Sequence, residues 1–239
     1  ALKKCIQMDM YNLKELVTRL IAGSSIEINP DKFQNDMTTF ASADDVLTLL
    51  VHLGYLTYDF DTCTVHIPNQ EVQKEFINCI EDGGWEPVMD AIRKSEELLA
   101  ATIRGEEETV ARMIENAHQE NTSILAYNDE NSLACVIALA YYSAKKNYVV
   151  YRELAGGKGF ADMVFVPRKT TQTPAIVVEL KWNQTAEAAI TQIKRKQYVE
   201  SLKDYRGEVI LVGINYESKE LKKDDYKKHS CKIERITMA

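Results

Sequence analysis

The sequence has no apolar run that approaches the roughly 20 residues needed to cross a bilayer. Its first residues, ALKKCIQMDMY, lack the apolar core of a signal peptide, so we expect a cytoplasmic protein. The five cysteines include no CxxC pair, and their odd number argues against a disulfide framework or a structural zinc site. The four histidines are equally dispersed along the chain, which argues against a histidine-based metal site.

Positive charge is also in the minority, with 29 Lys and Arg against 36 Asp and Glu and a net charge of −7. The imbalance is uneven: residues 1–100 hold 8 basic and 17 acidic residues, a net of −9, which leaves 21 against 19, or +2, for residues 101–239. Attraction to phosphate depends on local rather than total charge. The acidity of the whole chain therefore does not exclude a nucleic-acid enzyme.

The most informative stretch runs from residue 156 to 198 and reads GGKGFADMVFVPRKTTQTPAIVVELKWNQTAEAAITQIKRKQY. Its pattern predicts strands over 160–166 and 175–181 and a helix over 185–198. Residues two apart in a strand share a face, so Glu179 and Lys181 project together. If the two strands pair, Asp162 stands beside Glu179, and one pocket then holds two carboxylates and one ammonium.

Two neighbouring carboxylates repel each other, and a hard divalent cation with oxygen ligands, such as Mg²⁺, relieves that repulsion. The cation lowers the pKa of a bound water and neutralises charge on a scissile phosphate, while a nearby lysine orients the nucleophile or stabilises developing charge. We therefore expect Asp162 and Glu179 to hold Mg²⁺ or Mn²⁺ beside Lys181. Phosphodiester hydrolysis is the chemistry that this set of groups supports.

The acid-x-Lys tripeptide alone is a weak signal because it recurs in a polar run near the C-terminus. The further copies are Glu217/Lys219, Glu220/Lys222 and Asp225/Lys227. They follow no apolar strand, and we interpret them as solvated surface. Only Glu179/Lys181 follows Ala-Ile-Val-Val, a run typical of a buried strand.

Asp162, sixteen intervening residues, Glu179-Leu180-Lys181 and a following helix with Gln192 resemble the PD-(D/E)xK nuclease superfamily. More narrowly, GKGFAD, ELKWN and AITQIKRKQY resemble the nuclease-like domain that follows an AAA-ATPase-like domain in many bacterial proteins. The resemblance covers most of the second half of the chain. Ala161 departs from the proline of the superfamily name. The resemblance implies a restriction-endonuclease-like fold, a metal-dependent nuclease and an upstream ATPase-like domain in the full-length protein.

The resemblance also implies roles for residues outside the strand motif, and each has an alternative. An acidic residue on the first helix of the superfamily often joins the metal site, and Glu130 matches it, although Glu130 would equally favour the positive end of the helix dipole. Gln192 would lie near the metal and Lys196 toward substrate, or both would belong to an exposed polar face. Independently of the resemblance, Lys158 lies in the glycine-rich turn over 156–159, where it would contact the phosphate backbone or belong to an ordinary hairpin turn. Glu153 is either a further acidic member or a solvent-facing strand end.

The sequence pattern of residues 12–80 predicts a small helical unit with a hairpin. Apolar residues at helical spacing predict helices over 12–22 and 42–53, and a cap at Ser42 with Asp45 three residues on supports the second. Strands are predicted over 55–58 and 64–67, which gives a winged-helix-like order. The polar positions of the second helix include no Lys or Arg, so a packing or docking role is favoured over DNA recognition.

The spacing of apolar residues in the rest of the chain predicts further helices and strands, which gives an α/β protein. Helices are predicted over 71–80, 87–103, 106–118 and 128–145, and strands over 148–153, 208–214 and 232–237. We predict a winged-helix-like acidic domain over residues 1–83, a helical connector over 84–120 and a nuclease-like domain over 121–239. The expected fold class is a mixed sheet flanked by helices, preceded by the smaller helical domain.

The function favoured by the sequence is Mg²⁺-dependent hydrolysis of nucleic acid, with DNA as the first candidate substrate and no membrane partner. Two alternatives remain open. The domain keeps the nuclease fold as a non-catalytic interaction module beside an ATPase partner, or it binds nucleic acid without cleaving it. The presence of Asp162, Glu179 and Lys181 together favours the enzyme, because a decayed site need not keep all three.

Overall fold

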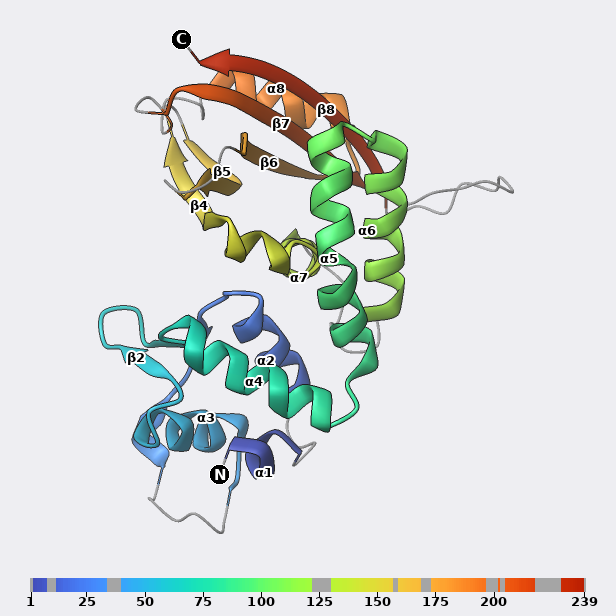
Figure 1. Ribbon diagram of the computed structural model, residues 1–239. Coiled ribbons are helices and arrows are strands. Elements are labelled where there is room, and N and C mark those ends of the chain that lie inside the picture. Colours follow the sequence, from blue (N-terminus) through green and yellow to red (C-terminus); the bar gives the residue numbers. More distant parts are fainter. Residues whose placement is uncertain are drawn as a thin grey trace. The chain divides into compact units, whose positions relative to one another are not determined.

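The computed structural model describes residues 2–7, 12–33, 40–121, 130–156, 159–168, 173–196, 202, 205–217 and 229–238. Within these ranges, the side chains of residues 32, 130–132, 153–156 and 159–161 are outside the description. The chain forms two compact units, residues 1–91 with 120–127 and residues 92–119 with 128–239. Figure 1 shows the elements of both units.

The first unit combines helices with a small antiparallel sheet of strand order β1-β3-β2. Its elements are α1 (Leu2–Gln7), α2 (Leu13–Ile21), β1 (Ile26–Glu27), η1 (Pro30–Lys32), α3 (Ala43–His52), β2 (Thr57–Asp59), β3 (Thr64–His66) and α4 (Gln70–Asp82), followed by the start of α5 (Glu86–Arg104). The predicted helices and the β2-β3 hairpin are confirmed, whereas α1 and β1 were not predicted. The winged-helix assignment stays a prediction.

Local signals explain where α3 and α4 begin. Ser42 accepts a hydrogen bond from the backbone of Asp45, whose side chain accepts in return from the backbone of Ser42, so the two form a capping box. Asn69 caps α4 by accepting from the backbone of Val72. The acidic first turn of α3 is thus used to start the helix, which supports a structural role for this charge.

The second unit is organised around a five-stranded sheet of order β4-β5-β6-β7-β8. Its elements are the rest of α5, α6 (Glu107–Asn121), α7 (Glu130–Ala140), η2 (Tyr142–Lys146), β4 (Tyr148–Gly156), β5 (Gly159–Pro167), β6 (Ala175–Trp182), α8 (Ala186–Lys196), β7 (Gly207–Tyr216) and β8 (His229–Met238). Strands β6 and β7 are parallel, and the other neighbours are antiparallel. The predicted mixed sheet flanked by helices is confirmed, and this architecture is consistent with a restriction-endonuclease-like fold.

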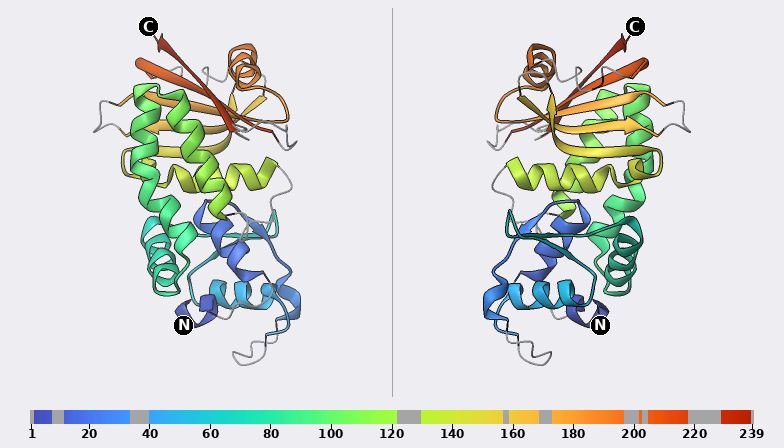
Figure 2. Two further views of the ribbon diagram at one scale, coloured as in Figure 1. Left: turned by 90° about the vertical axis from the view of Figure 1, so that its right-hand side faces the viewer. Right: turned by 90° about the vertical axis from the view of Figure 1, so that its left-hand side faces the viewer.

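Helices α7 and α8 cover opposite faces of this sheet (Figure 1; Figure 2). On the α8 face, Ile190 and Ile193 pack in one buried cluster with Val164, Val177 and further sheet residues. On the other face, the ring of Phe165 lies 5.4 Å from that of Tyr141 and 6.1 Å from that of Tyr148, measured between centroids. Because side chains alternate along a strand, Asp162, Glu179 and Lys181 share the α8 face with Val164 and Val177.

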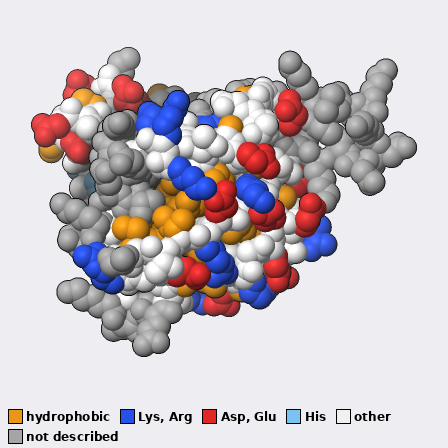
Figure 3. All heavy atoms as spheres, turned by 90° about the horizontal axis from the view of Figure 1, so that it is seen from above, with side chains coloured by type: hydrophobic (Ala, Val, Ile, Leu, Met, Phe, Trp, Pro, Cys, Tyr) orange, Lys and Arg blue, Asp and Glu red, His pale blue; other side chains and the backbone are white. Residues whose placement is uncertain are grey.

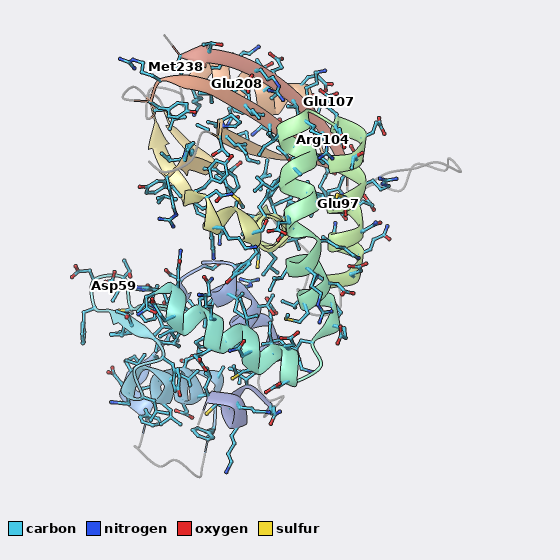
Figure 4. The ribbon with its side chains drawn as sticks, viewed as in Figure 1. Asp59, Glu97, Arg104, Glu107, Glu208 and Met238 are labelled. Carbon is cyan, nitrogen blue, oxygen red and sulfur yellow. The ribbon has the colours of Figure 1, made fainter. Side chains whose placement is uncertain are left out.

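The turn between α5 and α6 lies against the edge strand β8, and Figure 4 labels Arg104 and Glu107 at this turn. Glu107 Oε1 accepts from the backbone N–H of Ile233 at 2.9 Å, and Lys232 Nζ lies 3.1 Å from the same oxygen. Arg235 donates to the carbonyl of Ile103. These contacts protect part of an exposed strand edge, a position that otherwise invites pairing with another chain.

Residues 92–119 therefore pack with the sheet and belong to its unit. The predicted division at residues 83 and 120 stays a prediction. The loop predicted between the last two strands falls on residues 218–228, outside the described residues. Over the described ranges, we find no helix with the length and apolar character that a membrane crossing demands.

Candidate active site

The candidate site lies on the α8 face of the sheet and combines residues of β5, β6 and α8. Antiparallel pairing of Met163 with Val178 places Asp162 next to Glu179, the arrangement expected if these two strands pair. Lys181 follows two residues later on the same face. Strand β6 is the central strand and is buried along nearly its whole length, which explains its apolar run.

The carboxylate of Glu179 is almost completely buried, at 2% exposure, and Lys181 is 8% exposed. Lys181 Nζ lies 3.1 Å from Glu179 Oε1, and the side-chain amide of Gln192 on α8 donates to the same oxygen. The other oxygen, Oε2, is buried without a hydrogen-bond partner among the described residues. A buried carboxylate oxygen without a donor is costly, so this atom marks a place for a positively charged ligand.

Asp162 is fixed by the neighbouring strand. Its Oδ2 accepts a hydrogen bond of 2.6 Å from the backbone N–H of Leu180. This contact ties the carboxylate of β5 to β6 between the two charged residues of the strand motif. The side chain is therefore oriented by the sheet and does not depend on a loop, which suits a site that must hold its groups in fixed positions.

Burial and the neighbouring charge of Asp162 both act on the pKa of Glu179. Burial raises the pKa of Glu179, and the charge of Asp162 raises it further, to about 7. The hydrogen bonds and charge from Lys181 and Gln192 act in the opposite direction but do not compensate. Lys181 and Gln192 thus stabilise the carboxylate form of Glu179 only in part, and either a proton or a bound cation would offset its remaining charge.

The donor set of Asp162 and Glu179 fits a hard cation such as Mg²⁺ or Mn²⁺, which prefers carboxylate oxygens and retains several waters. Among the described residues, however, no group of three or more His, Cys, Asp or Glu side chains converges in the manner of a complete metal centre. The two neighbouring carboxylates of Asp162 and Glu179, with Lys181 beside them, are the arrangement that the described residues support.

Comparison with known protein families finds a match for the segment that contains this site. Residues 128–226 match the model of the PD-(D/E)XK nuclease superfamily. This segment is similar to nucleases. It includes Asp162, Glu179, Lys181 and Gln192, and it corresponds to α7, α8 and β4–β7. A search of the curated proteins found no match for the chain.

The other predicted residues of the nuclease-like segment are placed only in part. Glu130 is the first residue of α7, and its side chain is outside the description. Lys158 also lies outside the described residues. Glu153 stands opposite Asp162 in the β4-β5 register, because the pairs on both sides of it are formed, but its side chain is outside the description.

Lys196 lies in the last turn of α8, one turn beyond Gln192, together with Lys194 and Arg195. Lys194 is paired with Glu234 at 2.5 Å, whereas the structure records no ion pair for Arg195 or Lys196 within its described part. Figure 3 shows that basic and acidic side chains alternate over the described part of the face seen from above Figure 1. The positive charge near the site is therefore local and modest.

The fold also brings together three titratable residues that the sequence did not connect. Glu115 Oε2 lies 2.5 Å from His229 Nδ1, and His229 Nε2 lies 3.1 Å from His118 Nδ1. Glu115 and His118 belong to α6 and His229 begins β8, so more than a hundred residues separate the partners. We call this hydrogen-bonded chain the α6-β8 clasp. No spacing in the sequence indicates it, because only the folded sheet places β8 beside α6.

Proposed function

We propose that the nuclease-like segment is a metal-dependent nuclease. The observation that supports this most directly is the state of Glu179. One oxygen is held by Lys181 and Gln192, and the other is buried beside Asp162 with no partner in the part of the chain that the structure describes. Superfamily members generally hydrolyse phosphodiester bonds, and divalent metals are their usual cofactors. A buried carboxylate with a second, partly buried carboxylate beside it suits the metal binding that a metal-dependent phosphodiesterase requires.

In this proposal Asp162 and Glu179 hold Mg²⁺ or Mn²⁺, and Glu130 assists them. The cation, when bound, supplies an activated water and neutralises charge on the phosphate. Lys181 orients the attacking water or stabilises the negative charge that develops in the transition state. Gln192 holds Oε1 of Glu179 and so directs Oε2 toward the ligand.

The proposed substrate is nucleic acid, with DNA as the first candidate. Lys158 and Lys196 would contact the phosphate backbone at either side of the reacting group. We further propose that the full-length protein has an AAA-ATPase-like domain upstream of this chain, and that the winged-helix-like unit serves as a docking module for it. The acidic first turn of α3, which is used for helix capping, supports docking over DNA recognition.

One observation favours a second candidate function. The Lys181–Glu179 pair is closed and buried, which is also the geometry of an ion pair that holds two strand residues in place. A non-catalytic domain that keeps the nuclease fold, with Lys181 as a structural residue, would contain the same contact. Binding of nucleic acid that persists after both carboxylates are neutralised would favour the other alternative, a domain that binds nucleic acid without cleaving it.

The test is cleavage of plasmid and single-stranded DNA in Mg²⁺ or Mn²⁺, compared with the same reaction in EDTA. We expect cleavage only with metal, and we expect Asp162→Asn to abolish both cleavage and Mn²⁺ binding measured by titration calorimetry. The matched control is Glu96→Gln, which removes an exposed carboxylate paired with Lys146 and should change neither. Metal binding that survives Asp162→Asn would place the metal elsewhere.

A further inference from the structure

The turn that joins β6 to α8 is attached to the end of β7 by two hydrogen bonds. The backbone N–H of Asn183 donates to the carbonyl of Tyr216 at 2.7 Å. The backbone N–H of Gln184 donates to the side-chain oxygen Oδ1 of Asn215 at 2.9 Å. Asn183 itself adopts φ 55°, in the left-handed region that Asn tolerates better than most residues. The chain therefore leaves β6 along a defined path.

Asn215 interrupts the apolar pattern of β7. It is 5% exposed and lies beside Lys181 in the parallel β6-β7 register. A buried amide in such a strand is costly unless it is hydrogen-bonded, and the N–H of Gln184 supplies a partner for its oxygen. The side-chain oxygen of Asn215 thus accepts the hydrogen bond that a backbone carbonyl would accept in a regular ladder. This contact holds Gln184, which lies two positions before α8 begins.

Gly213 makes the second contact between β7 and α8. It pairs with Glu179 in the β6-β7 register. A Cβ atom at this position would lie 2.3 Å from the carbonyl oxygen of Ala186 and 3.0 Å from the Cβ of Ala189. Neither neighbour can yield easily, since one is backbone and the other is a short helix side chain. Only glycine lets the first turn of α8 approach the sheet this closely.

The contacts of Asn215 and Gly213 matter for the site because they position the start of α8, and the same helix carries Gln192. Ala186 begins the helix, and Gln192 lies six residues further on, roughly 9 Å along the axis. A displacement of the first turn would therefore be transmitted to the amide that donates to Glu179 Oε1. Helix N-capping by Thr185, which accepts from the N–H of Ala188 at 3.0 Å, keeps this start regular.

We propose that Asn215 and Gly213 are positioning residues, which seat α8 on β7 so that the Gln192 amide meets Oε1 of Glu179 and Oε2 stays available. Neither residue touches the reacting groups in this proposal, and their effect on catalysis is exerted through Gln192. The expected effect on the cleavage rate rests on the proposed nuclease function, whereas the expected effect on the Gln192–Glu179 contact does not. A test can therefore separate the two.

The first experiment measures geometry and needs no activity. The side-chain amide of Gln192 is observed in ¹H-¹⁵N spectra of the full chain and assigned by its loss in Gln192→Ala. We expect Asn215→Ala to move this resonance toward that of an exposed glutamine, because the donor no longer meets a carboxylate. A folded Asn215→Ala protein in which the resonance keeps its wild-type position would overturn the proposal.

Two further variants guard against a simple loss of folding. Asn215→Ser keeps a polar atom but shortens its reach, and we expect the same direction of change in the Gln192 resonance. Thr102→Val is the control, because it removes a buried hydrogen bond of 2.7 Å to Tyr141 elsewhere in the same unit. Thr102→Val should lower the melting temperature and leave the Gln192 resonance unchanged. An equal shift in the control would reduce the effect to general destabilisation and overturn the proposal.

The second experiment is a double-mutant cycle on the cleavage rate. Loss of an outer partner of a metal ligand typically costs about 10- to 100-fold in activity, and we expect Asn215→Ala to fall in that range. In the Gln192→Ala background the same substitution should cost less than about threefold, because its route to the site is already gone. Equal costs in both backgrounds would show that Asn215 does not act through Gln192. If the wild type does not cleave DNA, the proposed function fails, and the Gln192 resonance still decides the positioning role.

Discussion

Two glutamates of the same unit, the buried Glu179 and the partly buried Glu115, show how differently a carboxylate can be used. Each lies beside a cationic or potentially cationic partner, Lys181 for Glu179 and His229 for Glu115. In Glu115 both oxygens are occupied, since Gln119 donates to Oε1 at 2.9 Å and His229 contacts Oε2. In Glu179 both donors meet the same oxygen and Oε2 has none among the described residues.

Their pKa shifts follow from this difference. For Glu115, burial acts to raise the pKa, but His229, together with Gln119 and His118, outweighs it and lowers the pKa below its usual value. For Glu179, burial and the neighbouring Asp162 prevail and raise the pKa to about 7. A saturated carboxylate is part of the scaffold, whereas one with an unsatisfied oxygen and a like charge beside it is prepared for a ligand.

The largest difference between the two glutamates should appear on removal of their charge. We expect Glu179→Gln to abolish Mn²⁺ binding and reduce cleavage below detection, because it removes a ligand that the pocket has no means to replace. Glu115→Gln should retain both properties after correction for folded fraction. Titration calorimetry and a cleavage assay on the two variants make the comparison. Metal binding by Glu179→Gln would contradict the assigned role of Oε2.

Removal of the two partners, Lys181 and His229, should also have different effects on cleavage rate and stability. Lys181→Ala should preserve folding and Mn²⁺ binding but lower the cleavage rate by at least about a hundredfold, the usual scale for loss of one electrostatic stabiliser. If Lys181 is instead structural, its removal leaves a buried carboxylate unpaired and lowers the free energy of unfolding by about 3–5 kcal/mol. Rate and melting temperature of the same variant distinguish these outcomes, and a stable, fully active variant would defeat both.

His229 is the corresponding partner in the α6-β8 clasp. Its replacement by Ala leaves Glu115 without its main donor and removes the contact with His118, so we expect a loss of about 2–3 kcal/mol in stability. The cleavage rate per folded molecule should stay within about twofold of wild type, the opposite of the result for Lys181→Ala. Chemical denaturation and the cleavage assay provide both numbers. A large rate loss with normal stability would show that the clasp belongs to the catalytic machinery.

The smallest expected difference is in the pH dependence of metal-free stability. A carboxyl whose folded pKa is raised, such as Glu179, contributes stability at low pH that is lost as pH rises from about 4.5 toward about 7. A carboxyl with a lowered pKa, such as Glu115, contributes stability above its usual pKa that is lost as pH falls.

We therefore expect the melting temperature of the wild type to fall by no more than roughly 5 °C between about pH 5 and pH 8. Glu179→Gln should remove this decline. Mn²⁺ should remove the same decline in the wild type, because the cation compensates the carboxylate charge. Glu115→Gln should leave that slope unchanged and lower the melting temperature by a similar amount across the range, because the contribution of Glu115 is complete above its usual pKa. Thermal melts in EDTA across this range, with and without excess Mn²⁺, are the measurement, and identical slopes for both variants would contradict the distinction.

Local sequence determined the features that depend on neighbours along the chain. Ser42 and Asp45 start α3 because a capping box closes within one turn. The apolar run before Glu179 forms the buried central strand, and the period of two puts Glu179 and Lys181 on one face. The helix after β6 was predicted for the same reason, as its apolar residues recur at helical spacing.

Features that join distant segments required the tertiary structure. Strand register decides whether Asp162 stands beside Glu179, and packing of α8 on the sheet decides that Gln192 reaches the same carboxylate. The two-residue strand β1 is stabilised by pairing with β3 and has too little periodicity of its own to be predicted.

The α6-β8 clasp and the contacts of Gly213 and Asn215 that seat α8 on β7 also required the tertiary structure. Their residues carry no distinctive pattern in the sequence. His118 and His229 meet only because β8 closes the sheet next to α6. Gly213 and Asn215 matter only because the turn before α8 and its first residues come back against β7. Sequence by itself determined which residue types face together along a strand or helix, since that follows from backbone periodicity. Which faces meet was decided by the packed sheet, because contacts between segments depend on register and close approach that local patterns do not encode.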